Sequence, residues 1–147
     1  MTVGEGANGA ARPAMPRVTV QFDRLSRQYE PEQDLTVRYD VEGAPPESVR
    51  AVERSVLWYT EGKGEEDLFV HHFERLEGVS QVAEALPTGS VTVRLPASPL
   101  SYEGVIVKIR WCVRVRLFFN AGRDFVSEHV FELGAIAPAR GIVERLT

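Results

Sequence analysis

Residues 105–119 read Val105-Ile106-Val107-Lys108-Ile109-Arg110-Trp111-Cys112-Val113-Arg114-Val115-Arg116-Leu117-Phe118-Phe119, with an apolar residue at every odd-numbered position. The even-numbered row between them holds four cations and a cysteine. Alternation with a period of two places the two rows on opposite faces of a β-strand. At about 3.3 Å per residue this strand is roughly 45 Å long. The segment therefore predicts a β protein with one packed and one solvated face.

The bulk composition limits the class of protein. The chain has 147 residues, which corresponds to one domain with a single core. Hydrophobic residues make up 44% and charged residues 26%, which is ordinary for a globular protein. The net charge of -4 argues against a dedicated nucleic-acid binder, because such proteins usually carry a basic surplus. We therefore expect no nucleic-acid partner.

The cysteine usage and the N-terminal segment predict the compartment. Cys112 is the single cysteine, so no intrachain disulfide can form, and this favours a reducing compartment for a β-sandwich. The first 16 residues have neither the basic nor the apolar region of a secretory signal. The apolar runs are shorter than a membrane span. We expect a cytoplasmic protein without a membrane span.

The chain divides into three segments. Residues 1–16 are rich in Gly, Ala and Pro and predict a flexible N-terminal arm. Residues 17–133 alternate short apolar runs with turn signals and predict the β-sandwich domain. Residues 134–147 form a C-terminal tail, in which Ile142, Val143 and Leu146 suggest a short strand or a helical turn.

Seven strands are predicted within residues 17–133, and we expect no helix among them. Turn signals such as Gly43-Ala44-Pro45-Pro46 and the two glycines of residues 61–66 separate them. Short strands joined by hairpins and short loops are typical of an immunoglobulin-like antiparallel β-sandwich, which is our predicted fold class. The expected strands are Val18–Phe22, Leu35–Val41, Val49–Thr60, Leu68–Leu76, Val91–Leu95, Val105–Phe119 and Phe125–Leu133.

The basic row of the long strand has two interpretations. Lys108, Arg110, Arg114 and Arg116 could form a cationic track for a phosphate, an acidic peptide or an anionic lipid. We favour pairing with the outward row of the following strand, which is Asp124, Val126, Glu128, Val130 and Glu132. Two registers remain open: Arg114–Glu128 with Arg110–Glu132, or Arg116–Glu128. Each pair contributes only about 0.2–1 kcal/mol, but together they neutralise most of the row.

Other residues with chemical potential do not assemble into a catalytic or metal site. Neighbouring strand residues point to opposite faces, so His71 and His72 are not expected to share a metal. The acidic turn at Glu61, Glu65, Glu66 and Asp67 matches no calcium-loop spacing. Cys112 is interpreted as a small buried hydrophobe despite its cationic neighbours. We therefore predict no metal, no cofactor and no enzymatic activity.

The segment before the long strand is similar to a pattern of the arrestin-like superfamily. Members often carry Leu-Pro, then Pro-x-Ser-aromatic-x-Gly, then a long strand. The matching residues are Leu95, Pro96, Pro99, Ser101, Tyr102 and Gly104. Tyr29-Glu30-Pro31-Glu32-Gln33 likewise resembles the family's Tyr-x-Pro-Gly-Glu turn, with Glu32 where glycine is usual.

This resemblance implies an arrestin-like, immunoglobulin-like sandwich of a single-domain bacterial type. A full arrestin has two such sandwiches, and this chain has room for one. The motif's aromatic residue, Tyr102, is expected to anchor the crossing onto the sandwich. The polar core and phosphate-sensing residues of arrestins have no match here. The resemblance therefore implies an adaptor that binds another protein, and it does not imply receptor recognition.

Our functional hypothesis is a non-catalytic interaction module that binds a protein partner or forms a homo-oligomer. The contact would use a sheet edge or the outward face of the last hairpin. The candidate binding residues are Lys108, Arg110, Arg114, Arg116, Phe118, Val126 and Val130. The alternative is a carbohydrate- or small-ligand-binding sandwich that uses the loop aromatics Tyr29, Tyr59 and Tyr102.

Overall fold

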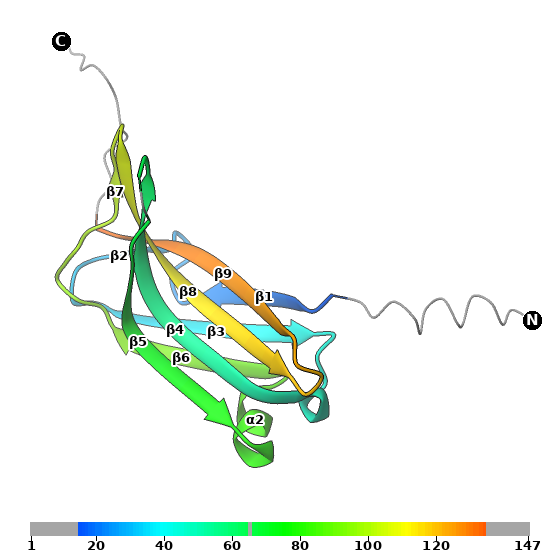
Figure 1. The fold of residues 1–147 in the computed structure, drawn as a ribbon. Helices are drawn as coiled ribbons and strands as arrows, with labels where there is room; N and C mark the ends of the chain where they lie inside the picture. The colour runs from blue at the N-terminus through cyan, green and yellow to red at the C-terminus, as the bar shows by residue number, and fades with distance from the viewer. Residues whose placement is uncertain (1–14, 65, 135–147) are drawn as a thin grey trace, which may run out of the picture.

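The computed structural model of the chain describes residues 15–64 and 66–134, and it consists of two facing β-sheets (Figure 1). The smaller sheet has the order β1-β3-β6, with β1 (Arg17–Phe22), β3 (Asp34–Glu42) and β6 (Thr88–Arg94). The larger sheet has the order β2-β9-β8-β4-β5, with β7 also on β8. Its strands are β2 (Gln28–Tyr29), β4 (Val49–Gly62), β5 (Leu68–Glu77), β7 (Tyr102–Glu103), β8 (Val107–Phe119) and β9 (Asp124–Leu133).

The predicted fold class is confirmed. Seven strands have six residues or more, and the two short strands β2 and β7 add to them. Every strand pair is antiparallel except β2 with β9, which is parallel. The arm 1–16 and the tail 134–147 fall outside the described residues, apart from residues 15, 16 and 134.

The apolar row of β8 forms the centre of the core, as predicted. From Trp111 to Leu117 the odd-numbered side chains have no exposed surface. One core cluster gathers around Trp111 and Val113, with Tyr29, Leu35 and Phe131. A second cluster gathers around the lower part of β8 and includes Tyr39, Val82, Ala85, Val115 and Leu117. β8 therefore contributes to both clusters and connects the two ends of the sandwich.

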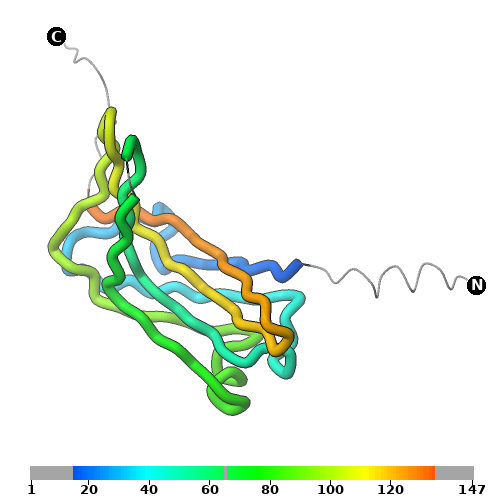
Figure 2. Tube along the Cα trace, viewed as in Figure 1, coloured from blue at the N-terminus to red at the C-terminus, as the bar shows by residue number. Residues whose placement is uncertain are grey.

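The upper end of the long strand differs from the prediction. The strand begins at Val107 rather than Val105, and Val105 is 77% exposed although it belongs to the predicted packed row. At this end β8 pairs with β7 and with the end of β4, and these strands project beyond the sandwich (Figures 1 and 2). The row loses its packing because the ladder is longer than the smaller sheet that covers it.

The expectation of no helix is wrong in one place. A short helix, α2 (Val79–Ala85), follows β5, and a 3-10 turn, η1 (Pro46–Ser48), precedes β4. Val82 and Ala85 of α2 are buried and close the lower end of the core. Fewer than two turns give no repeating apolar period, so the pattern offered no helical signal. Within the described residues, no helix is long and apolar enough to cross a membrane.

The expectation that Tyr102 anchors the crossing onto the sandwich is also wrong, because Ser101 makes the anchoring contacts. Tyr102 is about half exposed. The N–H of Ser101 donates to the carbonyl of Leu133 at 2.8 Å, and the Ser101 hydroxyl accepts from the N–H of Leu133 at 2.8 Å. The Trp111 indole donates to the carbonyl of Pro99 at 2.8 Å. The crossing is therefore fixed by main-chain and hydroxyl contacts to β9 and by the core tryptophan.

The turn at residues 30–33 places a non-glycine residue in the left-handed region. The N–H of Gln33 donates to the carbonyl of Glu30 at 3.1 Å, Pro31 takes the first corner, and Glu32 takes the second with a φ of 66°. This is the geometry of a type II turn, in which glycine is preferred at the second corner. The family's usual glycine therefore has a physical reason, and Glu32 carries a conformational cost.

We predict that Glu32→Gly raises the free energy of unfolding by about 0.5–1 kcal/mol, because it removes this cost. The exposed contact between Glu32 and Arg94, at 3.8 Å, contributes little in water. Urea denaturation measures the change. The matched control is Glu30→Gly, which adds backbone freedom without relieving strain and is expected to lower stability. An equal effect of both variants would contradict the strain interpretation.

Candidate interaction surfaces

All four cations of the predicted basic row have carboxylate partners. Their positions follow from β8, whose even-numbered row faces outward beside β4 and β9. The shortest contacts are Lys108–Glu103 at 3.2 Å, Arg110–Glu61 at 2.7 Å, Arg114–Glu128 at 2.6 Å and Arg116–Asp124 at 2.5 Å. The row is therefore a paired surface rather than an open cationic track.

The pairing confirms one predicted contact and corrects two. Arg114 faces Glu128 across the β8–β9 ladder, as one register required. Arg110 does not reach Glu132, because Glu61 of β4 and Glu103 of β7 lie closer to it. Arg116 binds Asp124 rather than Glu128. The following strand alone does not determine these partners, because β4 and β7 also flank β8.

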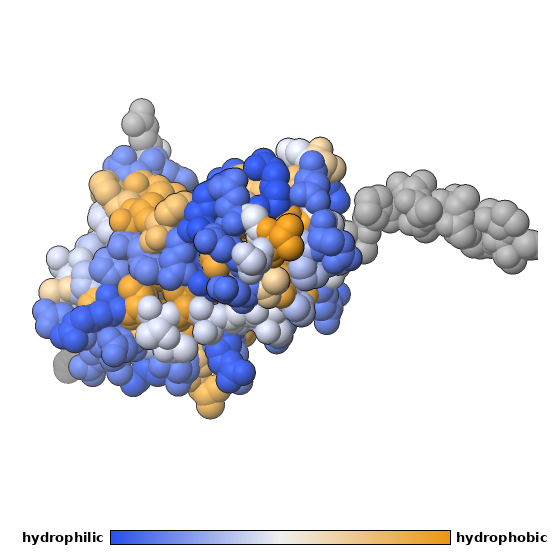
Figure 3. Space-filling model, turned by 90° about the horizontal axis from the view of Figure 1, so that it is seen from below, coloured by the Kyte–Doolittle hydropathy of each residue, from blue (hydrophilic) through white to orange (hydrophobic). Residues whose placement is uncertain are grey.

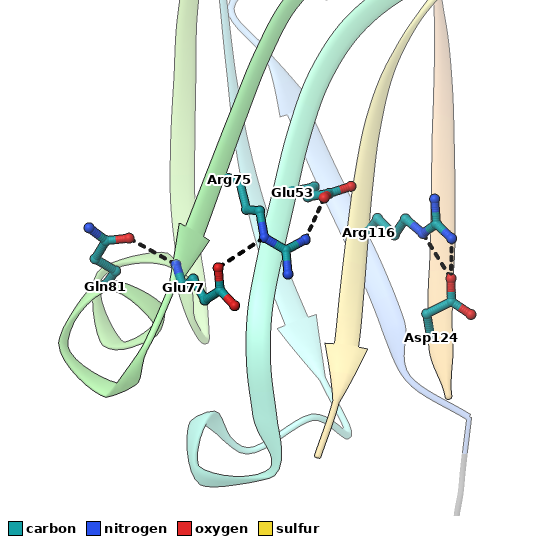
Figure 4. Close-up of polar contacts among 6 residues, drawn as sticks. All are labelled: Glu53, Arg75, Glu77, Gln81, Arg116 and Asp124. Atoms are coloured by element: carbon teal, nitrogen blue, oxygen red, sulfur yellow. Dashed lines mark hydrogen bonds and ion pairs between the residues drawn. The ribbon is translucent and has the colours of Figure 1, made fainter. Parts of the chain in front are cut away.

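Three guanidinium groups lie near the ring of Phe118 at the lower end of this face. Arg50, Arg75 and Arg116 lie 5.5, 4.9 and 4.8 Å from the centre of its ring. Figure 4 shows two of these cations with their acids: Arg75 binds Glu53 and Glu77, and Arg116 binds Asp124. The hydrogen bonds of Glu53 and Glu77 raise the pKa of the Arg75 guanidinium further above its usual value. The ring is therefore covered by cation–π contacts.

The outer face also carries apolar residues that the ion pairs do not use. Val126 and Val130 of β9 are about 40% exposed. Cys112, opposite Val130, is fully buried, and burial raises the pKa of its thiol to about 12. The thiol therefore stays protonated at neutral pH, which argues against a reactive thiolate. Of the predicted binding residues, only the two valines offer exposed apolar surface without an ionic partner.

We predict that Arg114→Glu lowers the free energy of unfolding by about 0.2–1 kcal/mol, because it places two carboxylates opposite each other. Glu128→Arg should have a similar effect through two cations. The double exchange Arg114→Glu/Glu128→Arg should recover most of the loss. Thermal or urea denaturation of the four proteins measures this cycle. Additive losses in the double variant would show that the pair does not interact.

A second surface is the edge formed by β5. This strand ends the order of the larger sheet and pairs with β4 on one side. Leu68, Val70 and Phe73 face outward, because they pair with Tyr59, Leu57 and Ser55 of the outer face; Phe73 is 54% exposed. Phe69 is also about half exposed and stacks on Trp58 at 4.3 Å. The first half of β5 therefore exposes apolar side chains on both faces.

The other terminal strands differ from β5 in composition. The outward residues of β6 are Thr88, Ser90, Thr92 and Arg94, and those of β1 are Arg17, Thr19 and Gln21. On β9, beyond its short pairing with β2, the outward acids Asp124 and Glu128 alternate with valines. Polar and charged residues are the usual protection of a sheet edge. Among the described strands, β5 has the least of this protection over residues 68–73.

A polar network lies between the sheets on the inner side of β5. Arg54 donates to Glu74 and, at 3.3 Å, to the hydroxyl of Tyr39, which donates to the carbonyl of Ala85 at 2.9 Å. His72 lies 3.2 Å from Glu74. Burial raises the pKa of Tyr39, so its hydroxyl stays protonated and can donate. The network joins β3, β4 and β5 to the end of α2. In the sequence, this network could have been recognised from Arg54, a charged residue within the otherwise apolar inward row of β4.

The network gives a pH prediction. Burial raises the pKa of Glu74, but the hydrogen bonds and charges of Arg54 and His72 outweigh it and lower the pKa below the ordinary 4.5. The contribution of ionised Glu74 to the free energy of unfolding is therefore complete above about pH 4.5, the ordinary pKa. It is lost as the pH falls through the lowered pKa of the folded protein. We expect Glu74→Gln to lower stability by about 1 kcal/mol at neutral pH, after allowance for its partial exposure.

The difference in the free energy of unfolding between Glu74→Gln and the unchanged chain should become smaller when denaturation is measured below pH 4.5. Glu77→Gln is the control, since Glu77 pairs with Arg75 in a more exposed position. If this difference in the free energy of unfolding stays constant with pH, the pKa of Glu74 is not lowered on folding.

His71 and His72 do not alternate between the two faces of β5, because the strand has a bulge between them and Val70. His72 pairs with Val56 and Val70 pairs with Leu57, which leaves His71 as the extra residue. His71 lies against the ring of Trp111 and the carbonyl of Arg94, so both histidines lie on the inner side. Even so, no cluster of three or more potential ligands occurs among residues 15–64 and 66–134.

The three tyrosines of the alternative hypothesis do not form one platform. Tyr29 is buried, and its hydroxyl donates to Asp23 at 2.5 Å. Tyr59 is partly buried on the outer face, and burial raises its pKa. Tyr102 is exposed on the projecting hairpin. These positions do not support a sugar-stacking rim.

Comparison with known proteins supports the fold. No protein-family model and no curated protein sequence matches the chain. The structure is similar to that of Spo0M, a sporulation control protein from Bacillus subtilis, with a TM-score of 0.55 and 14% identity. The match covers 83% of this chain and 50% of that chain, so this chain spans half the length of the Spo0M structure.

A second similar structure is the soluble domain of PmoD from Methylocystis sp. ATCC 49242 (Rockwell). Its TM-score is 0.48 at 13% identity, over 82% of this chain and 91% of that chain. At these identities the likeness to Spo0M shows the fold alone: the chain is an all-β sandwich of the class to which that structure's matching half belongs.

Proposed function

We propose that this chain is a non-catalytic adaptor that binds an extended segment of a protein partner along the edge of β5. The observation that carries the proposal is the apolar first half of this terminal strand, with Leu68, Phe69, Val70 and Phe73 exposed. An added strand would form main-chain hydrogen bonds with β5, and its alternate side chains would contact these residues.

The chemistry of the edge defines the partner segment. Residues 68–73 contain no Asp, Glu, Lys or Arg, whereas Glu74, Arg75 and Glu77 follow them. A partner segment with alternating apolar side chains over five or six residues would match the first half of β5. Charged residues next to them would match the charged second half of the strand. The outer face beside it is neutral, because its cations are paired. The outer face that carries the basic row is therefore a secondary surface for this segment, and the exposed side chains of Val126 and Val130 on β9 lie on it.

We further infer that the chain is a member of the arrestin-like superfamily and acts in the cytoplasm. The pattern from Leu95 to Gly104 and the sandwich topology support the first inference. The single buried cysteine is compatible with the second. Cofactors and a nucleic-acid partner have no part in this proposal.

The test is a selection from a displayed library of random twelve-residue peptides against the full chain. We expect enriched peptides with alternating apolar residues, and we expect Phe73→Glu/Val70→Glu to weaken their binding roughly tenfold or more. Fluorescence polarisation with a selected peptide measures the affinity. Val126→Glu, a matched exposed valine on β9, is the control and should bind like the unchanged chain.

Hydrogen exchange locates the bound peptide. Protection of β5 amides on peptide binding would support strand addition at this edge. Protection confined to β8 and β9, or weakening by Val126→Glu alone, would place the contact on the outer face instead. A selection that enriches no peptide at all would overturn the proposal.

A further inference from the structure

Two polar residues, Ser127 and His129, interrupt the inward row of β9. The rest of this row belongs to the core clusters or packs on them: Phe125, Phe131 and Leu133. Both polar side chains are partly exposed. Away from β8, the strand pairing of β9 that the structure describes is limited to Glu132 and Leu133, which pair with β2. Ser127 and His129 therefore lie at the margin of the core, where solvent can reach them.

The two side chains form a short hydrogen bond. Ser127 Oγ lies 2.6 Å from His129 Nε2. This distance is within the range in which a general base takes a proton from a nucleophile. With its own proton on Nδ1, the neutral imidazole accepts the hydroxyl proton through Nε2. A serine hydroxyl next to such a base is an activated nucleophile.

The surroundings of His129 favour its neutral form. Burial lowers the pKa of His129, and the charge of Arg27 lowers it further, whereas the charge of Glu128 raises it. Arg27 lies just before β2, and its guanidinium donates to the carbonyl of Val130 at 3.3 Å. The neutral imidazole is the form that can accept a proton. The base is therefore available at neutral pH.

A main-chain donor follows the serine directly. The N–H of Glu132 donates to the carbonyl of Arg27 at 2.8 Å, so the even-numbered residues of β9 direct their main-chain groups away from β8. The register with β8 is regular from Phe131 to Asp124, so the N–H of Glu128 also points away from β8. In the nucleophile elbow of α/β-hydrolases, the N–H of the residue after the nucleophile stabilises the developing oxyanion. The N–H of Glu128 is available for the same role.

The surface near this pair suits a small acyl donor. Val126, which precedes Ser127, is 43% exposed. Figure 3 views the lower end of the molecule, where β9 begins, and shows apolar patches bordered by hydrophilic surface. Because both polar side chains are partly exposed, a small ester can reach the hydroxyl without opening of the core.

We propose that Ser127 is a nucleophile that takes an acyl group from small activated esters, with His129 as its base. Ser127 Oγ forms a bond to the acyl carbon, and the hydroxyl proton moves to His129 Nε2. The bond between the acyl carbon and the leaving oxygen then breaks, and Nε2 returns the proton to that oxygen or to water. The products are acylated Ser127 and a free alcohol or phenol.

This covalent step is independent of the adaptor proposal. β9 and β5 lie on opposite sides of β8 and β4 in the larger sheet, so an acyl group on Ser127 leaves the β5 edge accessible. The step also requires no turnover.

The experiment treats the full chain with p-nitrophenyl acetate. Release of p-nitrophenolate measures the rate, and peptide mapping by mass spectrometry locates the acetyl group. We expect acetylation of Ser127, and His129→Gln should slow it about a hundredfold or more because the base is lost. Ser90→Ala removes an exposed serine of β6 and is the matched control, which should react like the unchanged chain. Thermal denaturation checks that each variant is folded.

The pH profile of the unchanged chain tests the role of the histidine without any variant. Since the pKa of His129 is lowered from 6.5, acetylation of Ser127 should be independent of pH above about 6.5 and should slow as the ring is protonated. A hydroxyl without a base would react roughly tenfold faster with each unit of pH.

Three results would overturn the proposal. They are acetyl groups confined to residues other than Ser127, an unchanged rate in His129→Gln, and a rate that rises with pH without a plateau. Phe73→Glu/Val70→Glu should be acetylated like the unchanged chain, so this test stays separate from that of the proposed function.

Discussion

The long antiparallel ladder between β4 and β8 is the constraint on which the rest of the structure depends. Its inward residues, among them Val52, Val56, Val113 and Val115, enter both core clusters. The facing strand β3 has nine residues and β6 has seven, whereas β4 has fourteen and β8 thirteen. The smaller sheet therefore covers only part of the ladder. The projecting upper end and its exposed apolar side chains follow from this difference in length.

The pleat of the same ladder determines the electrostatics of the outer face. Directly opposed residues share a face, so the cations of β8 meet acids supplied by β4, β7 and β9. The Glu61 carboxylate shows the effect: its hydrogen bond from Arg110 holds its pKa below the usual range. A surface that satisfies its own charges has little potential left for a charged ligand. For this reason the proposed function places apolar recognition at a sheet edge, where pairing stops.

The sequence predicted what depends on local period and on neighbouring strands. It predicted the seven main strands and the packed row from Trp111 onward, and it named Arg114–Glu128 in one of the two registers that it left open. It could not give Glu61 as the partner of Arg110, since that contact needs β4 beside β8 across 49 residues of chain. The bulge at His71 and the short α2 were missed for a different reason. Each spans too few residues to produce a period.

Three sites break a local rule, namely Glu32, Arg54 and the loop of Val105 and Ile106, and their surroundings differ. Glu32 has a positive φ, but its N–H donates to the carbonyl of Pro96, which ties the turn to the segment that follows β6. Arg54 interrupts an apolar row, but Glu74 and Tyr39 satisfy its guanidinium and join it to α2. Val105 and Ile106 occupy a loop that favours neither, and they are exposed. In the first two cases the fold uses the exception. In the third the two apolar side chains stay exposed, so the loop breaks the rule without burying them among the described residues.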